Sequence, residues 1–307
     1  MIISQTIQAL ILYKAGIDIN DITYYASGRC GDIFLYHGEL LKISPILDLY
    51  TYSSDIQNAY DIKLKFQNTL NLCGLYVPQI SPWENGKLAK IVKLEGNAFC
   101  VYKMQWLNGK HLISTELKPA NVRLIGKAIL TFMNTSSNIP YDTTEYLQWK
   151  NIIPKHYNLL PPHIKEQISR LKNRITATTL NLQYIHYDMS IQNIIFNKRM
   201  GFIDFDNVCI SDKTADIAGF LYSILNVDFR SGIIADSKYF RMVADELFKE
   251  LKLTNEDVRK VDLFMQYRRL FLFSVFYDTI KKANPSYYDL INESINNEIG
   301  FLEDYIE

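Results

Sequence analysis

Residues 184 to 206 constrain the fold more than any other stretch, because polar side chains recur there at fixed distances between short apolar runs. Residues 186–193 read His-Tyr-Asp-Met-Ser-Ile-Gln-Asn, and Asp204 ends the next apolar run eleven positions after Asn193. Apolar runs of a few residues bounded by turn residues are typical of short buried strands. We therefore expect a hairpin of 194–196 with 201–203, which would bring Asn193 and Asp204 to one edge.

These residue types suit phosphoryl transfer from a nucleotide. The reaction needs a carboxylate that orients and deprotonates the accepting hydroxyl, and hard oxygen ligands for Mg²⁺ at the phosphates. Asp188 fits the first role, and Asn193 and Asp204 fit the second. Any one of these residues alone is more often a turn residue or a helix cap than a site residue. Their joint spacing favours a kinase-type site.

The chain changes character near residue 106, and its 307 residues are enough for two domains. Before this point, short β-type runs alternate with turn residues, and one stretch with helical spacing covers 55–73. After it, the spacing of apolar residues is mainly helical. We expect an α+β fold, with a small five-stranded antiparallel lobe over 1–106 and a larger helical lobe over 107–307.

The 186–216 stretch resembles the family of aminoglycoside phosphotransferases and choline kinase-like small-molecule kinases, which share a two-lobed protein-kinase-like fold. Members carry H-G-D-x-x-x-x-N, then I-D-[FW]-[DEG], then an Asp that opens an Ala/Leu-rich helix. The matching residues here are His186-Tyr187-Asp188 with Asn193, Ile203-Asp204-Phe205-Asp206, and Asp216-Ile217-Ala218. The resemblance implies transfer of the γ-phosphate of ATP or GTP, with Mg²⁺, to a hydroxyl of a small molecule such as an aminoglycoside-like antibiotic or an amino alcohol.

The same resemblance gives roles to individual residues. Asp188 is the catalytic base in this interpretation, and Asn193 and Asp204 are the metal ligands. His186 braces the loop, and Asp216 fastens it from the following helix.

Two further positions in the segment leave alternatives open. Asp206 is either a carboxylate in the second shell of the metal, or a second metal's ligand, or a residue of a surface turn. Tyr187 stands where the family has Gly. We expect its large ring to lie beside the path of the acceptor hydroxyl.

The nucleotide side is marked by two features of the first lobe. Gly28 and Gly31 bound the turn between the first two expected strands, where kinase-like folds place a loop over the phosphates; an ordinary hairpin is the alternative. Lys42 lies in an apolar strand, and a buried Lys needs an anion, either a phosphate or a carboxylate. An edge-strand lysine that points into water is the other interpretation of Lys42.

The family pairs this lysine with a Glu on the following helix, but no Glu occurs between Lys42 and Glu84. Asp61 is the best substitute and Asp55 the second choice. The connector that includes Met104 and Trp106 resembles the one that binds adenine through backbone groups in the family. Recognition through the backbone does not distinguish ATP from GTP.

Charge argues against some partners. Lys and Arg number 33 and Asp and Glu number 33, so the chain is not built to neutralise nucleic acid or to bind an anionic membrane. No apolar run approaches about 18 residues, and we expect a cytoplasmic protein. A catalytically silent nucleotide-binding or scaffolding protein on the same fold is the alternative to the kinase, because no Glu is present to pair with Lys42 and because Tyr187 stands where the family has Gly.

Overall fold

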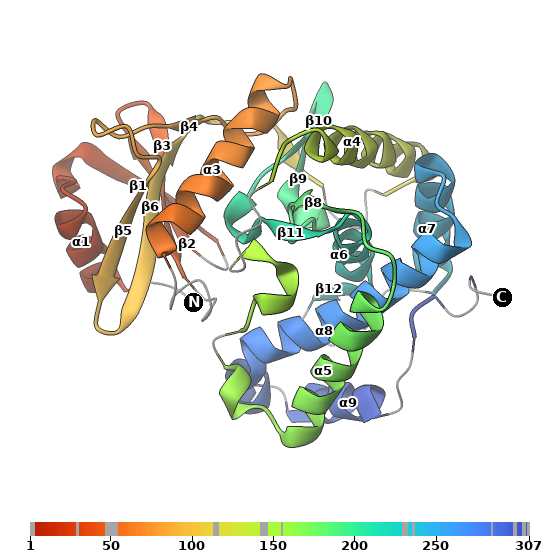
Figure 1. Cartoon of the computed structure of the whole chain (residues 1–307). Coiled ribbons are helices and arrows are strands. Elements are labelled where there is room, and N and C mark those ends of the chain that lie inside the picture. Colours follow the sequence, from red (N-terminus) through yellow and green to blue (C-terminus); the bar gives the residue numbers. More distant parts are fainter. Residues whose placement is uncertain are drawn as a thin grey trace.

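The computed structural model describes residues 4–28, 31–46, 55–112, 117–141, 147–154, 156–228, 233–234, 237–283, 285–296, 300–302 and 305. Figure 1 shows the first third of the chain as a β-sheet with two helices against it, and the remainder as a larger, mainly helical part. The hairpins that carry the segment discussed above lie between the two. The expected α+β architecture is thus present.

The sheet lobe contains six antiparallel strands rather than the expected five. They are β1 (Ile22–Gly28), β2 (Gly31–Tyr36), β3 (Glu39–Pro45), β4 (Ile80–Ser81), β5 (Ala89–Leu94) and β6 (Asn97–Met104). The order is β1-β2-β3-β6-β4, and β5 also pairs with β6. Strand β4 was missed because two residues after a proline carry no alternating pattern that the sequence could reveal.

Helices α1 (Gln5–Lys14) and α3 (Ile56–Leu72) cover opposite faces of this sheet. Side chains alternate between faces along a strand, so Val101 packs with α1 while Cys100 and Tyr102 pack with α3. The same alternation applies to β3, where Leu41 and Ile43 lie on the α1 side. Lys42 between them therefore points to the α3 side.

The helical lobe is built around one hydrophobic core, to which its helices contribute apolar side chains. They are α4 (Pro119–Ser137), α5 (Pro162–Thr176), α6 (Thr214–Leu225), α7 (Ser237–Leu251), α8 (Asn255–Ala283) and α9 (Pro285–Asn296). Two small sheets lie between this lobe and the six-stranded sheet. One joins β7 (Lys110–His111), β9 (Ile194–Asn197) and β10 (Arg199–Phe202), and the other joins β8 (Leu182–Ile185) and β11 (Cys209–Asp212). A third, of β12 (Asn226–Asp228) and β13 (Ile233–Ile234), follows α6.

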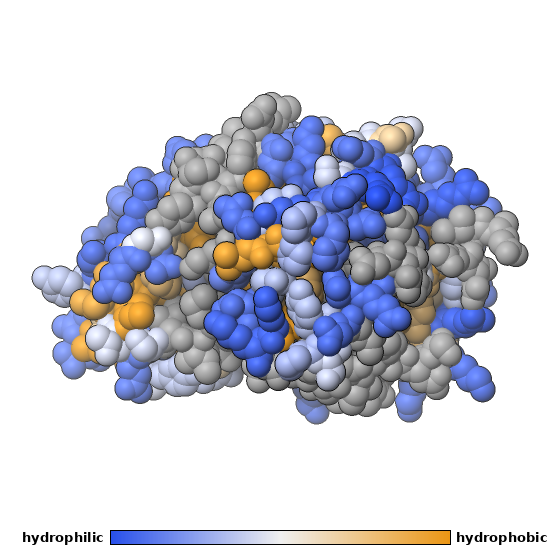
Figure 2. All heavy atoms as spheres, turned by 90° about the horizontal axis from the view of Figure 1, so that it is seen from below, coloured by the Kyte–Doolittle hydropathy of each residue, from blue (hydrophilic) through white to orange (hydrophobic). Residues whose placement is uncertain are grey.

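Among the described residues on the face in Figure 2, most are hydrophilic, and the hydrophobic ones lie in separate patches. Among the residues placed in the structure, no helix is both long and apolar enough to cross a membrane.

The hairpin of β9 and β10 is fastened to the sheet lobe at Gly201. Phe202 N donates to Tyr76 O over 3.0 Å. A Cβ atom on Gly201 would lie 2.5 Å from the same carbonyl oxygen and 2.5 Å from the Tyr76 ring. A backbone oxygen cannot move aside as a flexible side chain can, so this approach requires glycine.

We expect Gly201→Ala to lower the free energy of unfolding by about 1–3 kcal/mol, the usual cost of overpacking. Urea denaturation measures it. Gly219→Ala is the matched control, because a Cβ there would meet Met189 O at an ordinary 3.5 Å and alanine favours a helix by up to about 1 kcal/mol. Equal stability of the Gly201→Ala variant and the wild type would contradict the proposed steric requirement.

Candidate functional site

The hairpin of β9 and β10 brings Asn193 and Asp204 together. Ile194 pairs with Phe202, and Ile203 N donates to Asn193 O over 3.0 Å. The two polar residues therefore flank the open end of one hairpin, as expected from the sequence. The turn at the other end is tighter than expected, since only Lys198, with φ of 59°, separates the strands.

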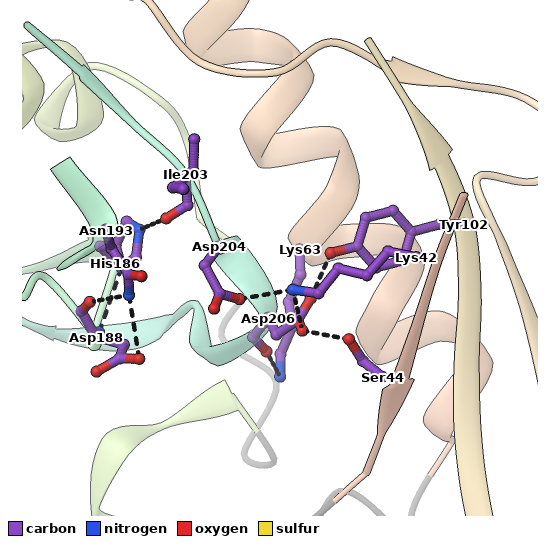
Figure 3. A network of polar contacts seen from close by, with 10 residues as sticks. All are labelled: Lys42, Ser44, Lys63, Tyr102, His186, Asp188, Asn193, Ile203, Asp204 and Asp206. Carbon is purple, nitrogen blue, oxygen red and sulfur yellow. Dashed lines mark hydrogen bonds and ion pairs between the residues drawn. The ribbon is translucent and has the colours of Figure 1, made fainter. Parts of the chain in front are cut away.

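Asp188 lies on the loop between β8 and this hairpin, next to Asn193 (Figure 3). Asn193 Nδ2 donates to Asp188 O over 2.8 Å and to Asp188 Oδ2 over 3.2 Å. Both partners are acceptors, so the amide nitrogen must face them and Asn193 Oδ1 points the other way. The Asn193 amide thus fixes the Asp188 carboxylate and keeps its own carbonyl available for a cation.

Two buried side chains brace this loop. His186 Nε2 lies 2.9 Å from Ile203 O, and Asp188 N donates to His186 Nδ1 over 3.3 Å. This pattern requires the neutral ring with its proton on Nε2. Asp216, at the start of α6, accepts from His186 N over 2.9 Å and from Tyr187 N over 2.7 Å. Burial raises the pKa of Asp216 to about 6, although the hydrogen bonds from the two backbone N–H groups and the charge of Arg268 oppose this.

The ring of Tyr187 does not lie beside the acceptor's path, which corrects the expectation from the sequence. Its side chain is buried and packs against Phe271 of α8, with ring centroids 5.6 Å apart. The backbone of Tyr187 has φ of 63°, in the region that glycine adopts without strain. The chain thus keeps the loop conformation of a glycine at this position and turns the ring into the core.

Arg268 of α8 is a site residue that the sequence did not reveal. Its Nη1 donates to Tyr187 O over 2.6 Å, and its Nη2 forms an ion pair with Asp188 Oδ1. Aromatic residues surround this arginine in the sequence, and this pattern favours core packing over a site. The available signal was the pair Arg268-Arg269 inside an otherwise apolar helical run, since a buried guanidinium needs an acceptor.

Lys42 reaches the hairpin from β3. Its Nζ lies 2.7 Å from Asp204 Oδ1 and 2.7 Å from Asp206 Oδ2, and only 8% of its side chain is exposed. Burial alone would lower the pKa of Lys42, but the attraction of the two carboxylates outweighs it and raises the pKa well above its usual value. The ammonium group is therefore charged at all physiological pH values.

Asp204 and Asp206 differ in their surroundings. Asp206 Oδ1 and Oδ2 accept from Tyr102 and Ser44, each over 2.6 Å, in addition to the pair with Lys42. Burial would raise the pKa of Asp206, but Lys42 and these hydrogen bonds lower it. For Asp204, burial raises the pKa; Lys42 opposes it, and the nearby Asp206 and Asp188 carboxylates add to the rise. The carboxylates of Asp188, Asp204 and Asp206 thus lie near one another, and Lys42 pairs with two of them.

Asp61 does not pair with Lys42, which corrects another expectation. Asp61 accepts from Leu88 N over 3.3 Å and from Gln57 Nε2 over 3.1 Å. The second choice, Asp55, caps α3 by accepting from Asn58 N over 3.1 Å. Both carboxylates serve local contacts of the helix, and Lys42 takes its acids from the other lobe.

The donor set at the hairpin fits a magnesium ion that is shared with phosphates. Within the described ranges, no group of three or more His, Cys, Asp and Glu side chains could hold a metal by itself. Mg²⁺ usually binds one or two carboxylates plus substrate phosphates and keeps several waters. Asn193 Oδ1 and Asp204 could supply such a partial set, and the negative charge at Asp204 favours a cation there.

The loop that we expect to contact the nucleotide phosphates lies between β1 and β2. Gly28 pairs with Gly31 at the end of β1 and β2, and the tip residues 29–30 lie outside the described residues. A Cβ on Gly31 would lie 2.5 Å from Ile43 O, so close strand packing alone requires this glycine.

The connector follows β6, whose last residue is Met104. The Trp106 ring is 40% exposed and contacts the Tyr25 ring edge-on, with centroids 4.6 Å apart.

The raised pKa of Asp216 has a consequence for stability. A carboxyl with a folded pKa of about 6 binds its proton more tightly than in the unfolded chain, where its pKa is near 4. Its contribution to stability is therefore largest below pH 4 and is lost as the pH rises through 6. Relative to Asp216→Asn, the free energy of unfolding of the wild type should fall by about 2 kcal/mol between pH 4 and pH 7. Urea denaturation at several pH values measures this difference; a difference that rises with pH would contradict it.

Comparison with known families gives a match to the model of the phosphotransferase enzyme family over residues 69–242. A search of curated proteins found no match. The matched residues include the hairpin, the loop of Asp188 and helix α6, and they cover more than half of the chain.

Solved structures of similar fold include an amicoumacin kinase in complex with AMP-PNP, Ca²⁺ and Ami, with a TM-score of 0.75, 12% identity and 97% of each chain covered. A microcompartment-associated aminopropanol kinase gives a TM-score of 0.63 and 14% identity, covering 93% of this chain and 92% of its own. The GDP and kanamycin complex of APH(2″)-IIIa gives 0.57 and 18%, covering 95% and 99%. The two-lobed, protein-kinase-like fold expected from the sequence is confirmed, and the chain belongs to the phosphotransferase enzyme family.

Proposed function

We propose that this phosphotransferase moves the γ-phosphate of ATP or GTP to a hydroxyl of a small molecule, with Mg²⁺ as cofactor. The meeting of Lys42 from the sheet lobe with Asp204 from the hairpin, one loop away from Asp188, supports this most strongly. Lys42 is then the cation for the phosphates, Asp204 the metal ligand and Asp188 the base for the acceptor hydroxyl, in the order that phosphoryl transfer requires. Residues 1–106 would bind the nucleotide, and 107–307 the acceptor.

In this proposal Asp188 orients the acceptor hydroxyl and takes its proton. Arg268 and Asn193 each use one of its oxygens, and each oxygen keeps a second lone pair for the hydroxyl. Bound Mg²⁺ would neutralise charge on the phosphates. Asn193 and Asp204 would hold it, and Lys42 would contact the phosphates.

The proposed acceptor is an amino alcohol or an aminoglycoside-like compound. Residues 217–307 carry 15 Asp and Glu against 11 Lys and Arg, a net charge of −4, which suits a cationic acceptor. The kanamycin bound in one of the structures above, and the aminopropanol in the name of another kinase, are of this class. Among those structures both AMP-PNP and GDP occur as nucleotides, so either donor is compatible with the fold.

A catalytically silent nucleotide-binding protein is the alternative. Its main motive was the missing acid on the helix, but Lys42 has carboxylate partners in Asp204 and Asp206. Thermal-shift titrations with Mg·ATP and Mg·GTP, followed by transfer assays on a panel of amino alcohols, aminoglycosides and sugars, separate the two. Ligand at 100 times its Kd should add about 2.7 kcal/mol to the stability. Binding without transfer to any acceptor would favour the silent protein.

We expect Asp188→Asn to lower kcat by about 10²–10⁴-fold, because the amide cannot take the hydroxyl proton. Nucleotide affinity, measured by isothermal titration calorimetry, should remain at the wild-type value. Asp245→Asn, an exposed change on α7, is the matched control and should leave both unchanged. Turnover of Asp188→Asn comparable with that of the wild type would remove the assignment of the base.

Asp204→Asn should instead act on metal-dependent binding. Loss of the carboxylate ligand is expected to weaken Mg·nucleotide binding by at least about tenfold, the usual cost of losing even an outer-shell partner of a metal. Calorimetric titration of nucleotide at a series of Mg²⁺ concentrations measures it. The metal assignment fails if the two proteins show the same dependence on Mg²⁺.

A further inference from the structure

The family's lysine–glutamate pair has no counterpart on α3. Over the described length of that helix the acids are Asp55 at its start and Asp61 within it, and both accept hydrogen bonds from their own surroundings. Lys42 has its polar contacts with Asp204 and Asp206. Among the described residues, the carboxylates that contact Lys42 both come from the loop that follows β10.

Helix α3 turns a cation toward this loop instead of an acid. Lys63 is 7% exposed, and its Nζ donates to the backbone oxygen of Asp206 over 2.9 Å. Residues two positions apart do not share a helix face, so a helix that presents Lys63 to the site cannot also present Asp61. The helix thus holds the main chain of Asp206 while the acid itself faces Lys42.

The carboxylate of Asp206 is built into the sheet lobe. Its oxygens accept from Ser44 of β3, from Tyr102 of β6 and from Lys42 between them (Figure 3). Its side chain is 11% exposed, against 34% for Asp204. Asp204 uses Oδ1 for Lys42, and no hydrogen bond within the described chain uses its Oδ2. One carboxylate is therefore fixed and the other is available to a ligand.

We propose that Asp206 is the positioning residue for Lys42, and takes the place that a helix glutamate holds in the family. This rests on the proposed function. When Asp204 turns to the metal, Asp206 keeps the ammonium group in place for the phosphates. Asp206 is accordingly assigned no place among the metal ligands, because its Oδ2 contacts both Ser44 and Lys42 and its Oδ1 accepts from Tyr102, all within the sheet lobe.

The test is nucleotide binding by calorimetry, with AMP-PNP in Mg²⁺ and in EDTA. Asp206→Asn should weaken binding at least about tenfold in both conditions, since it removes one partner of a buried charge pair. Lys42→Met should do the same, and the double variant should bind no more weakly than Lys42→Met. Non-additivity of this kind reports that the two residues act as one unit. KM for the nucleotide should rise, and KM for the acceptor should not.

Asp61→Asn is the matched control, because it makes the same chemical change on α3 and should leave binding unchanged. Tyr102→Phe and Ser44→Ala keep the carboxylate but remove one of its donors, and should weaken binding by a smaller factor. They replace Asp206→Asn if that variant does not fold.

Three results would overturn the proposal. They are an effect of Asp206→Asn that vanishes in EDTA, effects of Asp206 and Lys42 that add, and a loss with Asp61→Asn as large as that with Asp206→Asn. A wild type that binds neither AMP-PNP nor GDP would contradict the proposed function itself. A wild type that binds, with Asp206→Asn binding equally well, would contradict only the role of Asp206.

Discussion

The ammonium group of Lys42 lies where the sheet lobe meets the loop after β10, enclosed by the carboxylates of Asp204 and Asp206. An unpaired charge in such a place costs several kcal/mol, so the two lobes are bound to each other by the need to keep this group paired. Strand β3 is hydrogen-bonded on both sides, to β2 and to β6. Lys42 therefore cannot withdraw, and the loop from the helical lobe must come to it.

The neighbouring loop, which carries Asp188, is also held by charged side chains, which here bind its backbone groups. Asp216 accepts hydrogen bonds from the N–H groups of His186 and Tyr187, and Arg268 donates to the carbonyl oxygen of Tyr187. Tyr187 and Asp204 have φ of 63° and 68°, a conformation that costs about 1–3 kcal/mol in residues with side chains. Such strained positions persist where the surroundings over-determine them, and here both lie at the polar centre of the molecule.

The parts of the site that are close in the sequence could be predicted from it. Asn193 and Asp204 flank a hairpin whose strands are read from their apolar runs, and Asp188 lies five positions before Asn193. The partners of Lys42 could not be predicted from the sequence, because a pairing over 162 positions depends on how the two lobes dock. Arg268 is 80 positions from Asp188 and lies among aromatic residues. The spacing of apolar residues there predicts a buried helix, but it does not predict which side chain points out of the core.

Tyr187 illustrates a third limit. The resemblance to the family implies a glycine where Tyr187 stands, but the direction of the ring depends on space beside Phe271 that only packing defines. Strand β4 is missed for a related reason, since its two residues are held by β6 and by no pattern of their own.

One consequence of the Lys42 contacts concerns control of activity. In kinases where a movable helix carries the acid, an outward movement of that helix separates the acid from the lysine and inactivates the enzyme. Such enzymes are regulated through this movement. Here the acid arrives with the loop that also carries Asp204, so a shift of α3 would not by itself separate Lys42 from its counter-charge. The charge pair of Lys42 is therefore not controlled by the position of α3 alone.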